Sequence, residues 1–489
     1  MSHKLSATIR HGLVNKAGIT PQAHRLVEAL LEDDRERHHC YFNDIGFHNH
    51  SSHHLLAAYD LGASAKLLQA INDDASDGVK ILLPIRQGPP DLLETVTLGN
   101  WTEFLGKDNY YVAYLDFFLK EIEVNGAAKT LESFIFNPEA NGNGSKMFSR
   151  FLGGLFHPMI QIGYGAEFGS DAMVAQGIAQ VAVHPTFIPA LFEPESTEAT
   201  TGQPSLSLFE IIRQFYASDI LVPVMPYDAN ISVLDHVRMA AEDGRPAAIR
   251  ALVERWFSEE ESNLDIGRKH AELTWFATLQ LAGTGRPGRE PRPDFFLMHV
   301  LTSSFFLPSL DALISHPEHR IRLLKGFLAA ALFIGVTRGR PRINPNLLMS
   351  YTATPAPPKN AGAAPQYAAS SSALGDPNDI EATNPWDAII ESALHAPESH
   401  IVKAVRVLYY AAQKFGATPA GGVPGALDAA GDETITGMRN ADGTVFVRAA
   451  GVLMDQLGWV AHGQEAGSWD GSGLGWEAAW DGEAFKPRA

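Results

Sequence analysis

Histidine is concentrated in one short stretch of this sequence, where six of the nineteen histidines lie within the seventeen residues 38–54. Imidazole is the commonest metal ligand in proteins and the side chain that most readily moves a proton near neutral pH. The apolar run that follows, residues 55–59, is typical of a helix. His50 and His54 would then lie one turn apart on one face. Such a pair can bind one metal ion or one substrate oxygen.

Two further histidines, His157 and His299, stand alone in apolar segments. Burying an imidazole costs free energy unless it has a polar partner. Each of the two is as compatible with a hydrogen-bonded core histidine as with a metal ligand. Together with His50 and His54, they can form a set of four ligands that converge from different helices.

A polar pair lies in a later apolar segment, where Lys403 follows His400 by one helical turn. A buried lysine is often neutral, because burial lowers its pKa. A neutral lysine can react with carbon dioxide to form a carbamate, which binds metals as a carboxylate does. With Arg406 and Tyr410, the same pair also forms a stripe typical of the exposed face of an amphipathic helix. The sequence leaves both interpretations open.

Aromatic side chains accompany these histidines. Most aromatic residues of a helical protein lie in its core, but a pocket for a flat polycyclic substrate would use the same residue types, because offset stacking adds to burial. The candidate substrate contacts are Phe47, His48, Phe156, Tyr164, Phe295 and Phe296.

Familiar cofactor motifs are missing from the sequence. The glycines of 283–288 have the spacing of a dinucleotide-binding turn, but they follow a helical pattern and no βαβ unit surrounds them. We therefore interpret this stretch as a turn. We find no flavin or nicotinamide motif, no phosphate-binding loop, no nucleophile elbow and no zinc-protease motif.

The elements that must position these side chains are mostly helical. Thr20 and Pro21 have the types expected at a helix start, and apolar residues recur at helical spacing over 50–71, 147–162 and 446–457. Convincing alternating runs are few. We expect an all-α fold, a large multi-helix bundle or array that encloses a buried pocket.

The pattern predicts one helical domain over residues 1–489. Residues 352–384, rich in Pro, Ala and Ser, are expected to be a loop or disordered insertion that could cover the pocket as a lid. Residues 463–489, rich in Gly and Trp, are expected to be an irregular C-terminal tail.

Composition narrows the class of partner. The net charge is −18, from 38 basic and 56 acidic residues, which argues against nucleic acid and against an anionic membrane. The single cysteine, Cys40, excludes an internal disulfide and favours a reducing compartment. Because no secretory signal and no apolar stretch of bilayer length occurs, we expect a cytoplasmic protein.

The histidine-rich stretch, residues 41–56 continuing to Ser64, resembles the signature of the questin oxidase-like family, fungal oxygenases of polyketide pathways. The segments 153–165 and 400–406 and the helix around His299 resemble it as well, so that the resemblance extends from about residue 10 to about residue 460. The sequence departs from the pattern where apolar residues are expected, at Ser51, Ser52 and Asp60.

The resemblance implies an all-α enzyme that uses dioxygen to insert oxygen into, and open, a ring of an anthraquinone or its hydroquinone, in a reaction of Baeyer–Villiger type. Some relatives hold a non-haem iron with histidines and a carboxylated lysine, and others work without flavin. The positions here that match the iron ligands are His50, His54, His157, His299 and Lys403.

Two mechanisms follow from the resemblance. In the first, iron among these ligands activates dioxygen beside the bound quinol. In the second, without any metal, His50 or His54 deprotonates a phenol, the phenolate reduces dioxygen directly, and Lys403 or His400 stabilises the anion. An oxidised substrate would also need a separate quinone reductase.

Two other functions use the same residues. A non-catalytic helical protein could bind flat polyketides with histidines as hydrogen-bond donors. A hydrolase or cyclase could use zinc-bound water and would not depend on oxygen.

Overall fold

The computed structural model describes residues 8–43, 46–74, 83–85, 94–192, 205–257, 265–358, 370, 372–377 and 379–481. The chain forms two compact units. Unit 1 comprises Met1–Ala199 and Phe305–Ala330, and unit 2 comprises Thr200–Ser304 and Ala331–Ala489. The expected all-α class is confirmed, because across these ranges the chain is helical and β pairing is limited to isolated bridges. The single domain and the enclosed pocket remain predictions.

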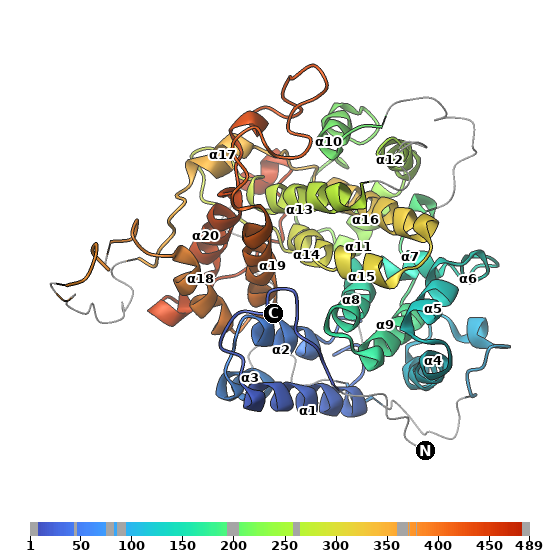
Figure 1. Cartoon of the computed structure of the whole chain (residues 1–489). Helices are drawn as coiled ribbons and strands as arrows, with labels where there is room; N and C mark the ends of the chain where they lie inside the picture. The colour runs from blue at the N-terminus through green and yellow to red at the C-terminus, as the bar shows by residue number, and fades with distance from the viewer. Residues whose placement is uncertain are drawn as a thin grey trace. The chain divides into compact units, whose positions relative to one another are not determined.

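The first three helices of unit 1 pack against one another (Figure 1, blue). They are α1 (Pro21–Arg37), α2 (Ser51–Asp60) and α3 (Ala65–Asp73). The predicted helix start is confirmed, because the Thr20 side chain accepts from the Ala23 backbone N–H and Pro21 opens the helix. The helix expected over 50–71 is interrupted between α2 and α3, where Gly62 has a φ of +89° that continues no helix.

The rest of unit 1 centres on α8 (His157–Phe168) and α9 (Asp171–Val183), which pack closely on each other. Both helices are buried along almost their whole length. A Cβ on Gly177 of α9 would lie 2.4 Å from Ile162 Cγ1 of α8, so glycine permits this approach. The remaining helices of the unit are α4 (Tyr111–Asn125), α5 (Ala127–Leu131), α6 (Pro138–Asn141), α7 (Met147–Phe151), α8 (His157–Phe168), α9 (Asp171–Val183), α15 (Leu307–Leu313) and the first part of α16 (Pro317–Thr337).

Unit 2 is built around α13, which packs on α14 and α20, while α19 packs on α14, α18 and α20. Val445 and Phe446 lie in the first turn of α20, so this apolar run belongs to the helix expected there. The helices of unit 2 are α10 (Leu208–Ala217), α11 (Val233–Ala240), α12 (Arg245–Glu254), α13 (Ile266–Ala282), α14 (Phe295–Ser304), the last part of α16, α17 (Pro345–Ser350), α18 (Pro385–Leu394), α19 (Ser399–Phe415) and α20 (Val445–Leu457).

The two segments expected to be irregular are partly described. Within 352–384, residues 359–369, 371 and 378 lie outside the described residues, and the described part contains no helix. Residues 463–481 contain only a short 3-10 turn, Glu477–Trp480, but their tryptophans are packed into the protein. Trp469, Trp476 and Trp480 are buried, and the Trp476 indole donates to the Val224 carbonyl at 2.9 Å.

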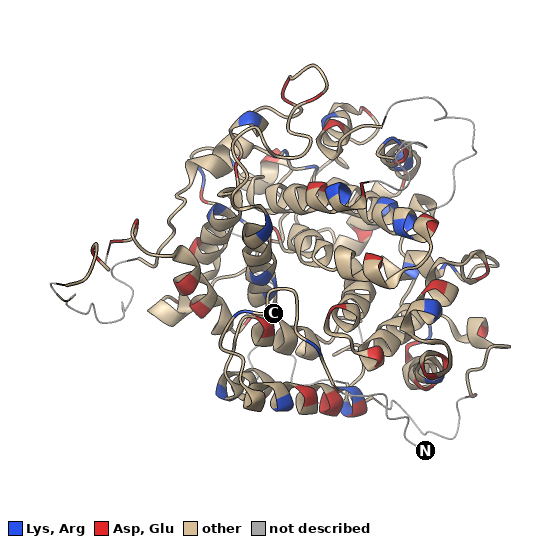
Figure 2. Ribbon diagram, in the orientation of Figure 1, with Lys and Arg blue, Asp and Glu red and all other residues tan. Residues whose placement is uncertain are grey.

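Charged residues of both signs share the helices. On α1, basic and acidic residues occur along the same ribbon (Figure 2), and Arg35 and Arg37 pair with Glu32 and Asp33. Among the described residues, none of the helices is by itself long and apolar enough to cross a bilayer, although the bent pair α14 and α15 together meets that length and composition.

Candidate active site

The backbone just before His157 forms a left-handed turn. The helix predicted over 147–162 is broken, because α7 ends at Phe151 and α8 begins at His157. Between them, Gly154, Leu155 and Phe156 have φ values of +54°, +53° and +67°. Left-handed backbone costs a non-glycine residue roughly 1–2 kcal/mol. Strain of this kind persists where the surroundings impose it and is concentrated at functional sites.

The turn also fixes which ring nitrogen of His157 carries a proton. His157 Nδ1 is hydrogen-bonded to the Gly154 carbonyl. Since a carbonyl oxygen only accepts, Nδ1 is the donor, and in the neutral ring Nε2 carries the lone pair. A metal-binding histidine is typically held in this way through its second nitrogen.

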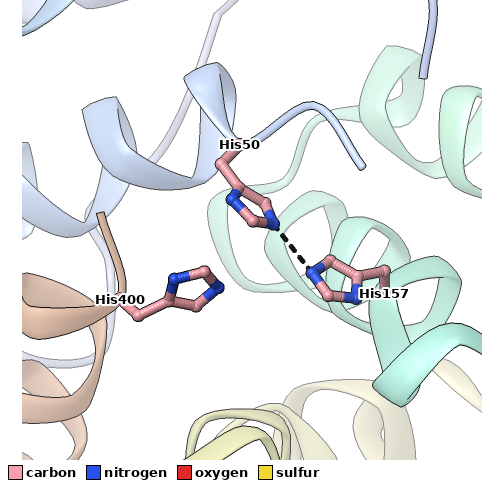
Figure 3. Close-up of side chains that lie close together, drawn as sticks. All are labelled: His50, His157 and His400. Atoms are coloured by element: carbon pink, nitrogen blue, oxygen red, sulfur yellow. Dashed lines mark hydrogen bonds between the residues drawn. The ribbon is translucent and has the colours of Figure 1, made fainter. Parts of the chain in front are cut away.

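His50 lies next to that lone pair. It precedes α2 as its N-cap residue, and its Nε2 lies 2.8 Å from His157 Nε2 (Figure 3). In the neutral pair, His50 Nε2–H donates to His157. If the His50 proton moves to Nδ1, both Nε2 lone pairs face the same point. Two nitrogens bound to one ion at about 2 Å lie roughly 3 Å apart, so the spacing suits a shared metal ion.

Two other imidazoles continue a stack of rings that begins at His157. The His48 ring is nearly parallel to His157, with centroids 4.0 Å apart and an angle of 3°. His184 stacks on His48 with centroids 5.3 Å apart. Burial lowers the pKa of His184 to about 4, so this ring is neutral at physiological pH.

The first turns of α2 carry two further histidines, His53 and His54. His53 Nε2 bonds Gln161 Oε1 of α8 at 2.8 Å, and its ring stacks on Tyr164 with centroids 5.0 Å apart. His54 is buried and lies one turn after His50, to whose carbonyl its backbone N–H donates. We call His48, His50, His53, His54 and His157 the unit 1 cluster.

Unit 2 brings together His299 and His400, from α14 and α19, with ring centroids 4.9 Å apart. We call these two residues the unit 2 pair. His299 Nδ1 donates to the Phe295 carbonyl at 2.8 Å, so its Nε2 carries the lone pair. Burial, followed by the nearby His400 and Lys403, holds the pKa of His299 well below its usual value.

His400 is held by a carboxylate. Glu398 is the N-cap of α19, and its Oε1 accepts from both the backbone N–H and Nδ1 of His400. Burial alone would raise the pKa of the Glu398 carboxyl, but His400, Lys403 and an indole N–H from Trp469 lower it to about 2. The group is therefore ionised at neutral pH, and His400 Nε2 carries the lone pair.

His39 shows what a purely structural histidine looks like in the same chain. Its Nδ1 accepts from the Tyr41 backbone N–H, and its Nε2 bonds the Asp108 carbonyl at 3.0 Å. Both ring nitrogens of His39 thus serve the backbone. By contrast, His157, His299 and His400 each use Nδ1 for an oxygen acceptor and carry the lone pair on Nε2.

A model of the questin oxidase-like family matches residues 47–408 of the chain. The chain belongs to this family. The resemblance found in the sequence is therefore confirmed, and the unit 1 cluster and the unit 2 pair fall inside the matched region.

Characterised proteins that resemble this family member are fungal. A questin oxidase of Aspergillus terreus is 28% identical over 389 residues, which is 78% of each chain. A Baeyer–Villiger monooxygenase of Cryptosporiopsis sp. is 28% identical over 301 residues, or 60% of this chain and 65% of the relative. A Baeyer–Villiger oxidase of Paecilomyces divaricatus is 27% identical over 307 residues, or 61% and 64%. The chain spans just under two thirds of the length of the last two.

The residues that the sequence singled out in this questin oxidase-like protein fall into both units. His50, His54 and His157 lie in unit 1, and His299, His400 and Lys403 lie in unit 2. The three histidines drawn in Figure 3, His50, His157 and His400, can each offer a ring nitrogen to a metal ion. Lys403 is buried on α19, so the exposed face that the sequence left open for it is ruled out.

The candidate substrate contacts differ in accessibility. Phe47 is 54% exposed, whereas Phe156 and Tyr164 are buried. Phe156 packs on Phe327, and Tyr164 packs on His53 and Phe306. In unit 2, Phe295 and Phe296 are partly buried at the start of α14. Their contact with substrate stays a prediction.

Sequence reasoning missed three side chains that hold the histidines: Gln161, His184 and Glu398. Glu398 left a signal, because an acidic residue just before an apolar helical segment is favoured by the helix dipole. Gln161 and His184 left none, since their role depends on which helices meet.

Proposed function

We propose that this protein is an oxygenase that uses dioxygen to open a ring of an anthraquinone or anthrahydroquinone polyketide, at a non-haem iron bound by histidines. The observation that carries the proposal is the unit 1 cluster: two imidazoles, His50 and His157, have their Nε2 atoms 2.8 Å apart beside a strained turn. Membership of the questin oxidase-like family and the oxygen-inserting relatives give the reaction class.

The donor set fits a ferrous ion. Imidazole suits iron well, and the second nitrogen of His157 is already bonded to a backbone carbonyl, as in known metal sites. In this proposal, His54, one turn after His50 on α2, is a further ligand. The assignment of His299 and Lys403 as ligands rests on the family resemblance, and metal titration of each variant tests it. Iron, when bound, supplies the one-electron chemistry through which dioxygen reacts with an organic substrate.

The chain's own residues have three tasks in this proposal. The left-handed turn and the Gly154 carbonyl orient His157. The apolar burial around α2 and α8 excludes water, which strengthens every electrostatic contact inside. Stacked aromatic and imidazole rings, such as His53 on Tyr164, provide flat surfaces of the kind that a polycyclic quinol recognises.

The deciding experiment combines metal analysis with an oxygen electrode. Protein purified without chelator is assayed for iron and zinc, and then supplied with a dihydroxyanthrahydroquinone. We expect bound iron and oxygen uptake, and we expect both His50→Ala and His157→Ala to lower kcat by at least about 100-fold with loss of the metal. The matched control is His316→Ala, at a histidine whose side chain is 60% exposed.

Each result has one meaning. Bound zinc together with turnover that does not need oxygen would show that the protein is a hydrolase or cyclase. Tight quinol binding without turnover would show that the protein is a non-catalytic binding protein. Unchanged kcat in both alanine variants would refute the role of the unit 1 cluster.

A metal-free oxygenase is the second candidate, and the observation that favours it is the contact of His400 with Glu398. A carboxylate on Nδ1 makes Nε2 a stronger base, as in hydrolase triads. In this version, a histidine deprotonates the quinol, and the resulting anion reduces dioxygen without a metal. Full activity after exhaustive chelation would favour this candidate over the iron site.

A further inference from the structure

Trp469 reaches His400 through one shared carboxylate. The Trp469 indole Nε1 donates to Glu398 Oε2 at 2.6 Å, while Glu398 Oε1 accepts from His400 Nδ1. Each oxygen of Glu398 is thus assigned to one partner. All three side chains belong to unit 2. Trp469 and His400 are almost fully buried, with 6% and 4% of their surfaces exposed.

The residue after Trp469 is tied to the helix that carries His299. The Asp470 backbone N–H donates to the Pro293 carbonyl at 2.9 Å, and the Asp470 carbonyl accepts from the Phe295 N–H at 2.8 Å. Phe295 is the first residue of α14. Residues 469 and 470 therefore contact the starts of both helices that carry the unit 2 pair.

This short segment is firmly anchored. Asp470 pairs with Arg292 at 2.6 Å, and both side chains are largely buried. Arg292 also bonds the Ala479 carbonyl and the Ser472 hydroxyl at 3.0 Å each. The segment lies beyond residue 408, where the family match ends.

We propose that Glu398 and Trp469 are positioning residues for the reaction, which fix His400 as the tautomer with its proton on Nδ1 and its lone pair on Nε2. The inference rests on the proposed function, in which His400 acts as the base of the metal-free candidate or offers its ring nitrogen to a metal ion. It goes further in assigning a task to Glu398 and to a C-terminal segment outside the family match.

The chemistry follows from what each group can donate. The Glu398 carboxylate only accepts, so both of its neighbours must be donors. A charge-assisted bond of this kind is roughly twice as strong as a neutral one. With Nδ1–H committed to Glu398, His400 can offer only Nε2 to a substrate proton or to a metal ion.

The substitution Glu398→Gln makes the contacts with His400 and Trp469 incompatible. An amide has one accepting oxygen and one donating nitrogen. If the oxygen faces His400, the NH2 group faces the Trp469 N–H, and two donors meet. Replacing Trp469 by phenylalanine removes that conflict. A double variant should therefore recover part of what Glu398→Gln loses, which a merely structural role does not predict.

The experiment measures kcat, KM and the His400 tautomer in one variant set. Glu398→Gln should lower kcat by on the order of 10- to 100-fold at nearly constant KM, and Trp469→Phe by about 3- to 10-fold. The double variant should be at least as active as Glu398→Gln. The matched control is Trp256→Phe, which removes an indole bond to Glu272 of 2.7 Å elsewhere in unit 2 and should leave kcat and the tautomer unchanged.

The tautomer is read by nitrogen NMR of metal-free, histidine-labelled protein, with His400→Gln used for assignment. This measurement needs neither turnover nor metal, so it separates failure of this inference from failure of the proposed function. A protonated Nδ1 in the unmodified protein, shifted towards Nε2 in Glu398→Gln, supports the inference. A protonated Nε2 in the unmodified protein, or strictly additive losses in the double variant, overturns it.

Discussion

Gly154 is the residue whose replacement should report most directly on the strained turn. Its φ is +54°, and a Cβ there would lie 2.3 Å from His184 Nε2 and 2.8 Å from His48 Cε1. Backbone strain and overpacking both oppose a side chain, so Gly154→Ala should lower the free energy of unfolding by about 2–5 kcal/mol. Urea denaturation measures this loss.

Gly244→Ala is the matched control for that substitution. Gly244 also has a positive φ, +73°, but nothing lies within 4 Å of the position where its Cβ would be. The control should show only the backbone term, about 1–2 kcal/mol. Equal losses in the two variants would show that the contact with His48 and His184 contributes nothing.

At the scale of single residues, the sequence indicated which histidines matter but not which nitrogen they use. His50, His54, His157, His299 and His400 were all singled out by type and spacing. The tautomer of His157 depends on a carbonyl in a left-handed turn, and that of His400 on a carboxylate. Leucine and phenylalanine rarely adopt left-handed backbone, so no rule of sequence predicts the turn at 154–156.

The contact between α8 and α9 links helix packing to the histidines. A Cβ at Gly177 would lie 2.4 Å from Ile162 Cγ1 and 2.8 Å from the Ile162 backbone nitrogen. Gly177→Ala should push α8 away and lower stability by about 1–3 kcal/mol. Because His157 is the first residue of α8, we also expect weaker metal binding, which titration with ferrous ion measures.

A second helical glycine provides the comparison. Gly267 lies in the first turn of α13, and nothing surrounds the position of its Cβ within 4 Å. Gly267→Ala should stabilise the protein by up to about 1 kcal/mol, because alanine is the better helix former. Tighter metal binding in Gly177→Ala than in the parent protein would contradict the proposed link.

The start of a helix was predictable where it depends on neighbouring residues in the sequence. The breaks in helices that depend on tertiary packing were not predictable. Thr20 and Pro21 marked α1 correctly, since a cap and an N-terminal proline act within a few residues. The prediction of a helix over 50–71 took no account of Gly62, although a glycine inside a helical pattern makes a continuous helix less certain. At the break before His157, Gly154 packs closely against His184, the C-cap residue of α9, and no local pattern reveals this contact.

Across the whole molecule, several buried histidines should make stability depend on pH. Burial lowers the pKa of His39, His184, His270 and His299. Between about pH 4 and 6.5 the unfolded chain binds more protons than the folded one, so stability is full above pH 6.5 and falls as pH decreases. For His184, the change from 6.5 to about 4 corresponds to about 3 kcal/mol.

Urea denaturation at a series of pH values tests this expectation. His270 is the useful probe, because burial is the cause that lowers its pKa to about 4. His270→Phe should reduce the proton uptake on unfolding between pH 6.5 and 4 by about one proton. An unchanged pH dependence in this variant would show that His270 is not kept neutral by folding.

At the same scale, the sequence pattern predicted the fold class but not the long-range contacts. Helical periodicity indicated an all-α chain, and that class is confirmed. The division into two units, and the bond between Trp469 and Glu398, join segments far apart in sequence. Such pairings depend on how helices pack, and a single sequence carries no local pattern for them.

The contact of Trp469 with Glu398 sets a condition for recombining this protein with its relatives. A crossover placed at the edge of the family match, residue 408, would combine Glu398 from one parent with residue 469 from another. Chimeras should retain activity when 398–481 is inherited as one block. A library that shuffles these two positions separately would produce folded hybrids with a lowered kcat.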